Sequence, residues 1–91
     1  MNKKELIEAI RQDLRLTVRE TERFINSFME NVTQELEDGG EVRLVGFGTF
    51  KTVEKAARKG INPKTLKAMD IPAKKTPKFT AGKKLKERVD K

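Results

Sequence analysis

Residues 54–76 form a stretch that a hydrophobic core can hardly use. The stretch alternates small and charged residues, and its large apolar side chains are few and separated: Ile61, Leu66, Met69 and Ile71. A chain of only 91 residues buries a modest part of its surface even when all of it packs. The length therefore predicts one small domain for the whole chain. Its thin core leaves two alternatives, which are partial disorder and a core completed by a second chain.

The residue types that are absent restrict the chemistry. The chain has no Cys, His, Trp or Tyr, which excludes disulfides, thiolate metal sites and a histidine general base. Gly82-Lys83 is followed by Lys84 rather than by Ser or Thr, so this segment is not a Walker-type phosphate loop. We expect no enzymatic activity, no metal, no cofactor and no small-molecule substrate.

No segment indicates a membrane or secreted protein. No apolar run approaches the ~20 residues of a membrane span, and the opening "MNKKELIEAI" lacks the apolar region of a signal peptide. A basic amphipathic helix, which would favour a membrane surface, is also missing. The sequence therefore predicts a soluble cytoplasmic protein that does not bind membranes.

Two helices are expected in the first part of the chain. Apolar residues recur at spacings of three and four over residues 3–14. Thr17 and Glu20 form a capping box that predicts the start of a second helix, and Gly39-Gly40 predicts its end. The second helix carries a wide apolar stripe, formed by Phe24, Ile25, Phe28, Met29, Val32 and Leu36.

Residues 41–53 change to strand-forming residues. Gly46 and Gly48 predict a tight turn between two strands; the alternative, a phosphate loop, has weak support from a lone G-x-G. The aromatic residues of this half either pack in the core or stack on bases. We favour packing, because the phenylalanines of the second helix need partners. These aromatic residues are Phe47, Phe50 and Phe79.

Residues 54–73 predict a two-stranded β-ribbon rather than a disordered basic linker. The turn-forming cluster 62–65 lies near the middle, between segments of similar length. Pro72 and Pro77 follow in the returning segment, and prolines in strands belong on edges. Because an isolated two-stranded ribbon is only marginally stable, we expect this arm to order when it binds its partner.

Residues 81–91 predict a short terminal helix with Thr80 as its N-cap. Its cations face outward, namely Lys83, Lys84, Lys86, Arg88 and Lys91. The single α+β domain, 1–91, is thus expected to contain a helical part that forms the dimer (1–40), a sheet (41–53 and 74–80), an arm (54–73) and this helix.

Charge is distributed unevenly along the chain. Residues 1–40 contain 6 Lys and Arg against 9 Asp and Glu, whereas residues 41–91 contain 15 against 5. This asymmetry favours a polyanion as the partner, although a solvated basic surface is the alternative. A ten-residue strand rises ~33 Å, about one turn of B-DNA. Two such arms could therefore follow a duplex and neutralise its phosphates.

The arm ends in Asn62-Pro63, within a cationic neighbourhood. Pro63 either fixes a turn or acts as a rigid apolar wedge. Gly60 allows a close approach of the backbone, and a wedge of this kind enters between base pairs from the minor groove and kinks the duplex. The cationic strands on both sides favour the wedge.

Four segments resemble the bacterial HU and integration host factor family, and the resemblance covers essentially the whole chain. These segments are "GFGTF" at 46–50, "AARKGINPKT" at 56–65, "DIPAKKTPKF" at 70–79 and "AGKKLKERV" at 81–89. The resemblance implies an intertwined homodimer with an N-terminal helical hairpin, a three-stranded antiparallel sheet extended into two protruding β-arms, and a short C-terminal helix. It implies a nucleoid-associated protein that bends double-stranded DNA with little sequence preference, and prefers bent, nicked or junction DNA.

The resemblance also implies roles for individual residues. Pro63 would intercalate, and Arg58, Lys59 and Asn62 would lie in the minor groove. Taken together with the cations of the arm, the residues expected to contact DNA are Lys3, Gly46, Gly48, Lys55, Arg58, Lys59, Gly60, Ile61, Asn62, Pro63, Lys64, Lys67, Lys74, Lys75, Lys78, Gly82, Lys83, Lys84 and Lys86. The dimer core would contain Phe24, Phe28, Met29, Val32, Leu36, Leu44, Phe47, Phe50 and Phe79.

Two positions depart from the family pattern. Ile61 stands where the family usually has arginine, which removes a groove contact. Leu66 stands where the family usually has glycine, and a positive φ there would disfavour a branched side chain.

Two alternative functions remain at this point. A sequence-preferring integration-host-factor-type subunit would pair with an unlike partner. A basic RNA-binding or ribosome-associated protein would be expected to use exposed aromatic residues, and none lies between Phe50 and Phe79.

Overall fold

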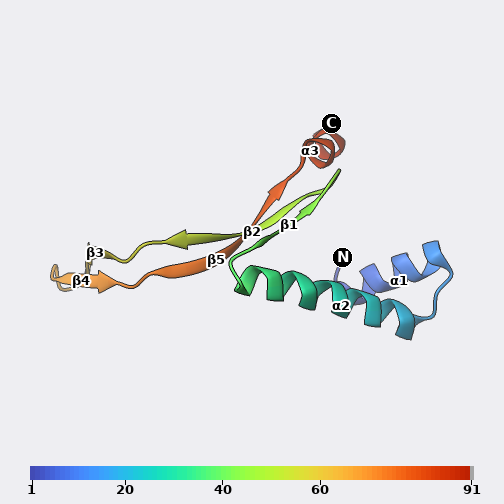
Figure 1. Ribbon diagram of the computed structural model, residues 1–91, viewed down its shortest axis with the longest axis horizontal. Coiled ribbons are helices and arrows are strands. Elements are labelled where there is room, and N and C mark those ends of the chain that lie inside the picture. The colour runs from blue at the N-terminus through green and yellow to red at the C-terminus, as the bar shows by residue number, and fades with distance from the viewer. Residues whose placement is uncertain (91) are drawn as a thin grey trace. The chain divides into compact units, whose positions relative to one another are not determined.

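The computed structural model describes residues 1–90, so that Lys91, the end of the predicted terminal helix, lies outside the described residues. Figure 1 shows helices and strands in the order α1 (Lys3–Leu14), α2 (Val18–Glu37), β1 (Glu41–Leu44), β2 (Gly48–Lys55), β3 (Arg58–Ile61), β4 (Ala68–Ile71), β5 (Lys74–Ala81) and α3 (Lys83–Val89). The chain divides into two compact units, Met1–Gln34 and Glu35–Lys91. The α+β class and the antiparallel strands with an extended arm confirm the predicted fold class.

Local chemistry sets the limits of α1. Asn2 is the N-cap, and its side-chain oxygen accepts a hydrogen bond from the backbone amide of Glu5 at 2.9 Å. At the other end, Arg15 takes the left-handed conformation with φ 56°, and the amide of Leu16 donates to the carbonyl of Arg11 at 3.0 Å. The helix occupies residues 3–14, as predicted.

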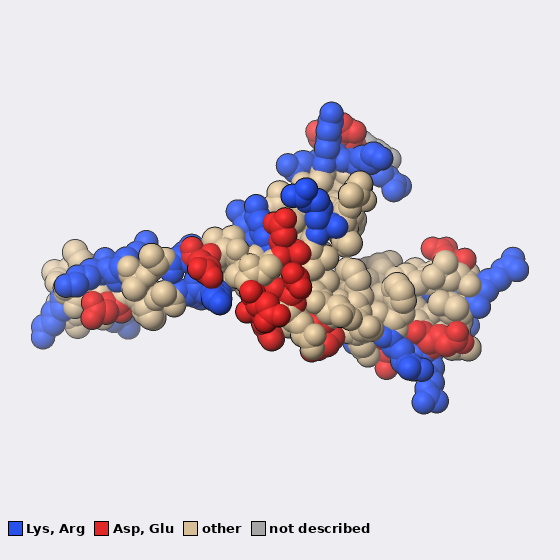
Figure 2. All heavy atoms as spheres, viewed as in Figure 1, with Lys and Arg blue, Asp and Glu red and all other residues tan. Residues whose placement is uncertain are grey.

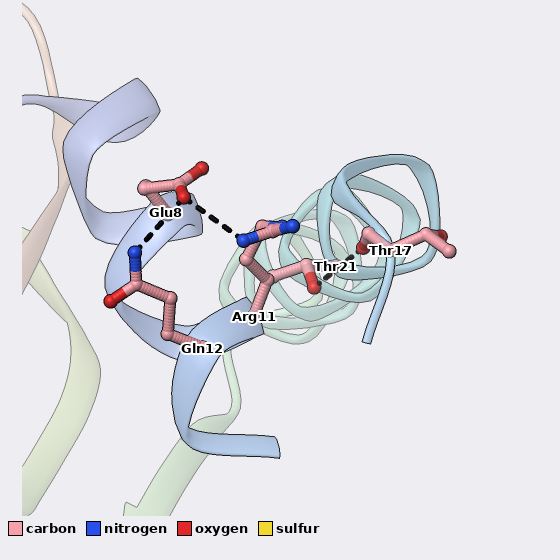
Figure 3. Close-up of polar contacts among 5 residues, drawn as sticks. All are labelled: Glu8, Arg11, Gln12, Thr17 and Thr21. Carbon is pink, nitrogen blue, oxygen red and sulfur yellow. Dashed lines mark hydrogen bonds and ion pairs between the residues drawn. The ribbon is translucent and has the colours of Figure 1, made fainter. Parts of the chain in front are cut away.

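Figure 3 shows polar contacts between residues three or four positions apart in the first unit. On α1, one carboxylate oxygen of Glu8 accepts from Arg11 at 3.0 Å and from Gln12 at 3.1 Å. On α2, the Thr21 side chain is fully buried, and its hydroxyl donates to the carbonyl of Thr17 at 3.0 Å. Thr21 is the one completely buried polar residue among the described residues of this unit, and this bond satisfies its hydroxyl group.

The predicted capping of α2 is confirmed, with one difference. The amide of Glu20 donates to the Thr17 hydroxyl oxygen at 3.1 Å. The Glu20 carboxylate accepts from the same hydroxyl at 2.9 Å, whereas a complete capping box would have it accept from a backbone amide. At the C-terminus Gly39 has φ 82° and donates to Leu36, while Gly40 donates to Glu35. These two bonds form a Schellman motif, so the predicted glycine stop is also confirmed.

The second unit contains a three-stranded antiparallel sheet in the order β1-β2-β5. The turn between β1 and β2 is closed by a hydrogen bond from the Phe47 amide to the Leu44 carbonyl at 2.9 Å, with Gly46 at φ 85°. Glycine at this position is typical of a type II turn. The G-x-G segment is therefore a hairpin turn, as predicted, and not a phosphate loop.

Three aromatic rings pack together on one face of this sheet. Phe50 and Phe79 are paired across β2 and β5, with ring centroids 4.7 Å apart, and Phe47 lies 5.5 Å from Phe79. Gly48 is buried beneath this cluster, because a Cβ there would come within 2.5 Å of the Phe79 ring and 2.7 Å of the Thr80 carbonyl. Packing thus accounts for the glycine at position 48.

The terminal helix begins later than predicted. Its N-cap is Gly82, which makes no side-chain capping bond, so the prediction of Thr80 as N-cap is wrong. Thr80 and Ala81 instead continue β5, where they pair with Thr49 and Gly48. The β2–β5 ladder therefore holds these two residues in extended conformation, and α3 starts only where the ladder ends.

The arm is a ribbon, as predicted, but its base belongs to the sheet. The β2–β5 pairing extends through Glu54↔Lys75 and Lys55↔Lys74, two residues beyond the predicted sheet. A separate ladder joins β3 to β4. Pro77 lies in β5, an edge strand, as expected for proline. Pro72 lies between β4 and β5 and interrupts the ribbon.

Candidate nucleic-acid interface

Asn62 organises the tip of the arm, a loop of residues 62–67 between β3 and β4. Its amide donates to the carbonyl of Lys67 at 2.9 Å, and its carbonyl accepts from the amide of Leu66 at 2.7 Å. Its side-chain oxygen also accepts from the amide of Lys64 at 2.9 Å. This last bond is an Asx turn, which fixes the chain around the exposed Pro63. The expected turn is therefore present, and it presents the proline to solvent.

Leu66 closes the tip in a strained conformation. Its φ is 58°, in the left-handed region, which a branched side chain occupies at a cost of about 1–2 kcal/mol. The glycine that is usual in the family would avoid this cost. The expected conflict at position 66 is therefore real, and the turn forms in spite of it.

The register of the ribbon separates its two faces. Lys59 lies opposite Asp70, and Ile61 lies opposite Ala68, on one face. Gly60 and Met69 lie on the other face, together with Ile71. A Cβ on Gly60 would lie 2.7 Å from Cδ1 of Ile71, so the Ile71 side chain covers this glycine. A side chain at position 60 would therefore require the end of the Ile71 side chain to move.

The arm is strongly cationic. Residues 55–69 contain no Asp or Glu, and Figure 2 shows Lys and Arg side chains along the arm and over α3. At the base, Lys75 lies 3.9 Å from Glu54, and both side chains are exposed. Such pairs contribute about 0–1 kcal/mol, so Lys75 remains available to an anion. The cations of the arm and its base are Lys55, Arg58, Lys59, Lys64, Lys67, Lys74, Lys75 and Lys78.

A second group of cations lies at the sheet and α3. The Gly82 amide donates to the Phe47 carbonyl at 2.8 Å, which fixes the start of α3 beside the β1–β2 turn. Gly46 lies beside Lys84, whose Cδ would be 3.9 Å from an added Cβ. The structure thus brings together two regions that both contain residues expected to contact DNA. Lys83 and Lys86 belong to the same short helix.

Two cations of the sheet, Arg43 and Lys51, were not among the residues predicted to contact DNA. Lys51 pairs with Lys78, and Arg43 pairs with Thr49. Because residues alternate between faces along a strand, these cations lie on the sheet face opposite the phenylalanine cluster. The alternation of Arg43 with the apolar Val42 and Leu44 was the available signal.

Lys3 belongs to the first unit. Its ammonium group donates to the side-chain oxygen of Asn26 at 2.6 Å, which ties the start of α1 to α2. This contact gives Lys3 a structural role, and its contact with DNA stays a prediction.

Residues 1–90 contain neither a membrane-spanning helix nor a group of metal ligands. None of the helices there has the length and apolar character needed to cross a membrane. Among the described side chains, no group of three or more Asp, Glu, His or Cys residues is placed to hold a metal ion.

Comparison with known proteins extends this picture. Residues 1–90 match the family described as "Bacterial DNA-binding protein". The chain is 52% identical over 90 residues to DNA-binding protein HU-beta 2 of Neisseria meningitidis, covering 99% of each chain. It is 46% identical over 91 residues to DNA-binding protein HU of Clostridium pasteurianum, covering all of both.

Solved structures agree with the sequence relatives. The Anabaena HU–DNA cocrystal structure matches with a TM-score of 0.86 at 39% identity, over 98% of this chain and 97% of that chain. HU from Thermotoga maritima matches with a TM-score of 0.69 at 29% identity, over 98% of each chain. The chain therefore belongs to the bacterial DNA-binding protein family of HU, whose members are architectural DNA-binding proteins and not enzymes.

Proposed function

We propose that this protein binds and bends double-stranded DNA with little sequence preference, as a homodimer that wraps two arms round the minor groove. The observation that carries this proposal is the arm itself: a cationic ribbon, without Asp or Glu over residues 55–69, that ends in an exposed proline. Contacts between these cations and DNA phosphates do not depend on the base sequence. The proposed location is the nucleoid, in the cytoplasm.

The wedge role of Pro63 is supported by how the tip is built. The three backbone and side-chain bonds of Asn62 hold the loop without using the proline ring, which stays exposed. A rigid apolar ring at the end of a cationic ribbon can enter a base step and unstack it. The bend that follows brings more of the duplex onto the cations of the sheet and α3.

The homodimer is supported by apolar side chains that one chain leaves exposed. Phe24 is 60% exposed, Met29 43% and Phe28 39%. On the sheet, Phe47 is 46% exposed and Phe79 39%. In each unit taken by itself, large apolar side chains that are exposed indicate an interaction site, and these residues belong to the predicted dimer core. A second copy would cover these side chains with the same residues.

Replacing Pro63 with alanine should reduce bending more than attachment. The phosphate contacts from Arg58, Lys59 and other cations remain, but the base step is no longer opened. Affinity for intact duplex should fall roughly tenfold, while affinity for nicked duplex, which needs no unstacking, should change less than about threefold. A fluorescence-transfer bending assay on both duplexes measures the two effects.

Pro72→Ala is the matched control, because Pro72 is also exposed but lies away from the tip. It should leave the bend of intact duplex unchanged. Equal bending by Pro63→Ala and the unmodified protein would mean that Pro63 only fixes the turn.

A further inference from the structure

The tip of the arm carries a second exposed apolar side chain that the turn itself does not need. Leu66 is 80% exposed, and it occupies the left-handed region with φ 58°. Two unfavourable features therefore coincide at one residue, since glycine or asparagine would fit this backbone better and a polar side chain would suit the exposure. An outlier of this kind is a reason to look for a function.

The surroundings of Leu66 indicate what would cover it. The loop holds Pro63 and Leu66 within one closed turn, because the Leu66 amide donates to Asn62 and the Asn62 amide donates to Lys67. Lys64 and Lys67, both exposed, lie on either side of Leu66 in the chain. A protein partner with an apolar pocket gains nothing from these lysines unless it is also acidic. A duplex offers both surfaces at once, as phosphates beside the apolar faces of sugars and bases in a widened minor groove.

We propose that Leu66 is a second apolar contact of the arm with duplex DNA, lying against sugars and base edges beside the step that Pro63 opens. This inference rests on the proposed function. Leu66 would thus contribute affinity without contributing to the salt dependence, because burial of an apolar side chain releases no counterions. Its strain in the free protein would be offset by burial in the complex.

Three substitutions separate this role from a role in the turn alone. Leu66→Asn and Leu66→Gly both suit the left-handed backbone but remove the apolar side chain. Each should weaken binding to intact duplex by about five- to thirtyfold, the range expected when a leucine side chain loses most of its burial. Leu66→Met keeps an apolar side chain of similar volume and should stay within about threefold.

The experiment measures duplex affinity of the full chain over a series of salt concentrations. For Leu66→Asn and Leu66→Gly, the slope of log K against log salt should equal that of the unmodified protein. Lys64→Ala, a neighbour in the same loop, is the charge control, and its slope should become shallower by about one for each copy bound.

The outcomes are distinct. If Leu66→Asn and Leu66→Gly bind as tightly as the unmodified protein or more tightly, Leu66 only closes the turn and this inference is wrong. A loss of affinity with an altered slope would also overturn it, because the contact would then not be apolar. If the unmodified protein shows no salt-dependent binding to duplex DNA, the proposed function itself fails.

Discussion

Raising the salt concentration from 50 to 200 mM should weaken binding to duplex DNA by about 1,000- to 100,000-fold. Residues 41–91 contain 15 Lys and Arg against 5 Asp and Glu, and the cations of the arm are free of strong internal pairing. If a bound dimer contacts about 6–10 phosphates, log K falls against log salt with a slope of roughly −5 to −9. Titrations of a labelled duplex at several salt concentrations measure this slope.

Single substitutions show which cations account for the slope. Lys59 lies on the arm and is exposed, and it occurs twice in the proposed dimer. Lys59→Ala should therefore make the slope shallower by about two, because each phosphate that is no longer neutralised reduces the slope by about one. Arg23→Ala, in α2, is the control and should leave the slope unchanged. A slope near zero for the unmodified protein would mean that the basic half does not contact the DNA backbone.

Placing a charge on the apolar stripe of α2 should prevent folding of the dimer. Phe28 is 39% exposed in one chain and belongs to the predicted dimer core. Removal of a buried phenylalanine costs about 3–5 kcal/mol, and an unpaired carboxylate adds its own desolvation. Since small domains are stable by about 5–15 kcal/mol, Phe28→Asp should be largely unfolded. Circular dichroism and light scattering at micromolar concentration measure this.

Gln34→Asp is the matched control, because it adds the same charge to the same helix. Gln34 is exposed and donates to Glu30 at 3.1 Å. This variant should remain folded and dimeric, with a change within about 1 kcal/mol. A well-folded monomer of the unmodified protein at micromolar concentration would contradict the proposed dimer.

The features that could be predicted from the sequence depend on neighbouring residues. The start of α2 follows from Thr17 and Glu20, which lie three positions apart, and its end follows from Gly39-Gly40. The strain at Leu66 was expected from the family resemblance, because glycine is usual at this position of the turn. In each case the residues that decide the structure are close together in the chain.

The features that could not be predicted depend on pairing between distant strands. Thr80 looked like an N-cap in its local sequence, but pairing with Thr49 keeps it in β5. The packing of Phe79 against Gly48 and of Ile71 against Gly60 also depends on strand pairing, while the contact of these glycines with DNA stays a prediction. The pairing of Lys51 with Lys78 likewise became visible only with the register of β2 and β5. A short sequence contains little information on such long-range registers.

The most direct test of the central claim compares four nucleic acids at one salt concentration: intact duplex DNA, nicked duplex DNA, a four-way DNA junction and duplex RNA. Contacts between the proposed arms and the bent duplex offset the free energy of unstacking a base step, which is a few kcal/mol. A nick or junction removes most of this unfavourable free energy. We expect the protein to bind nicked and junction DNA at least about tenfold more tightly than intact duplex. Duplex RNA, whose shallow minor groove has a different shape, should bind most weakly. Binding of duplex RNA as tight as that of the junction would contradict a DNA-bending function and indicate a general affinity for polyanions.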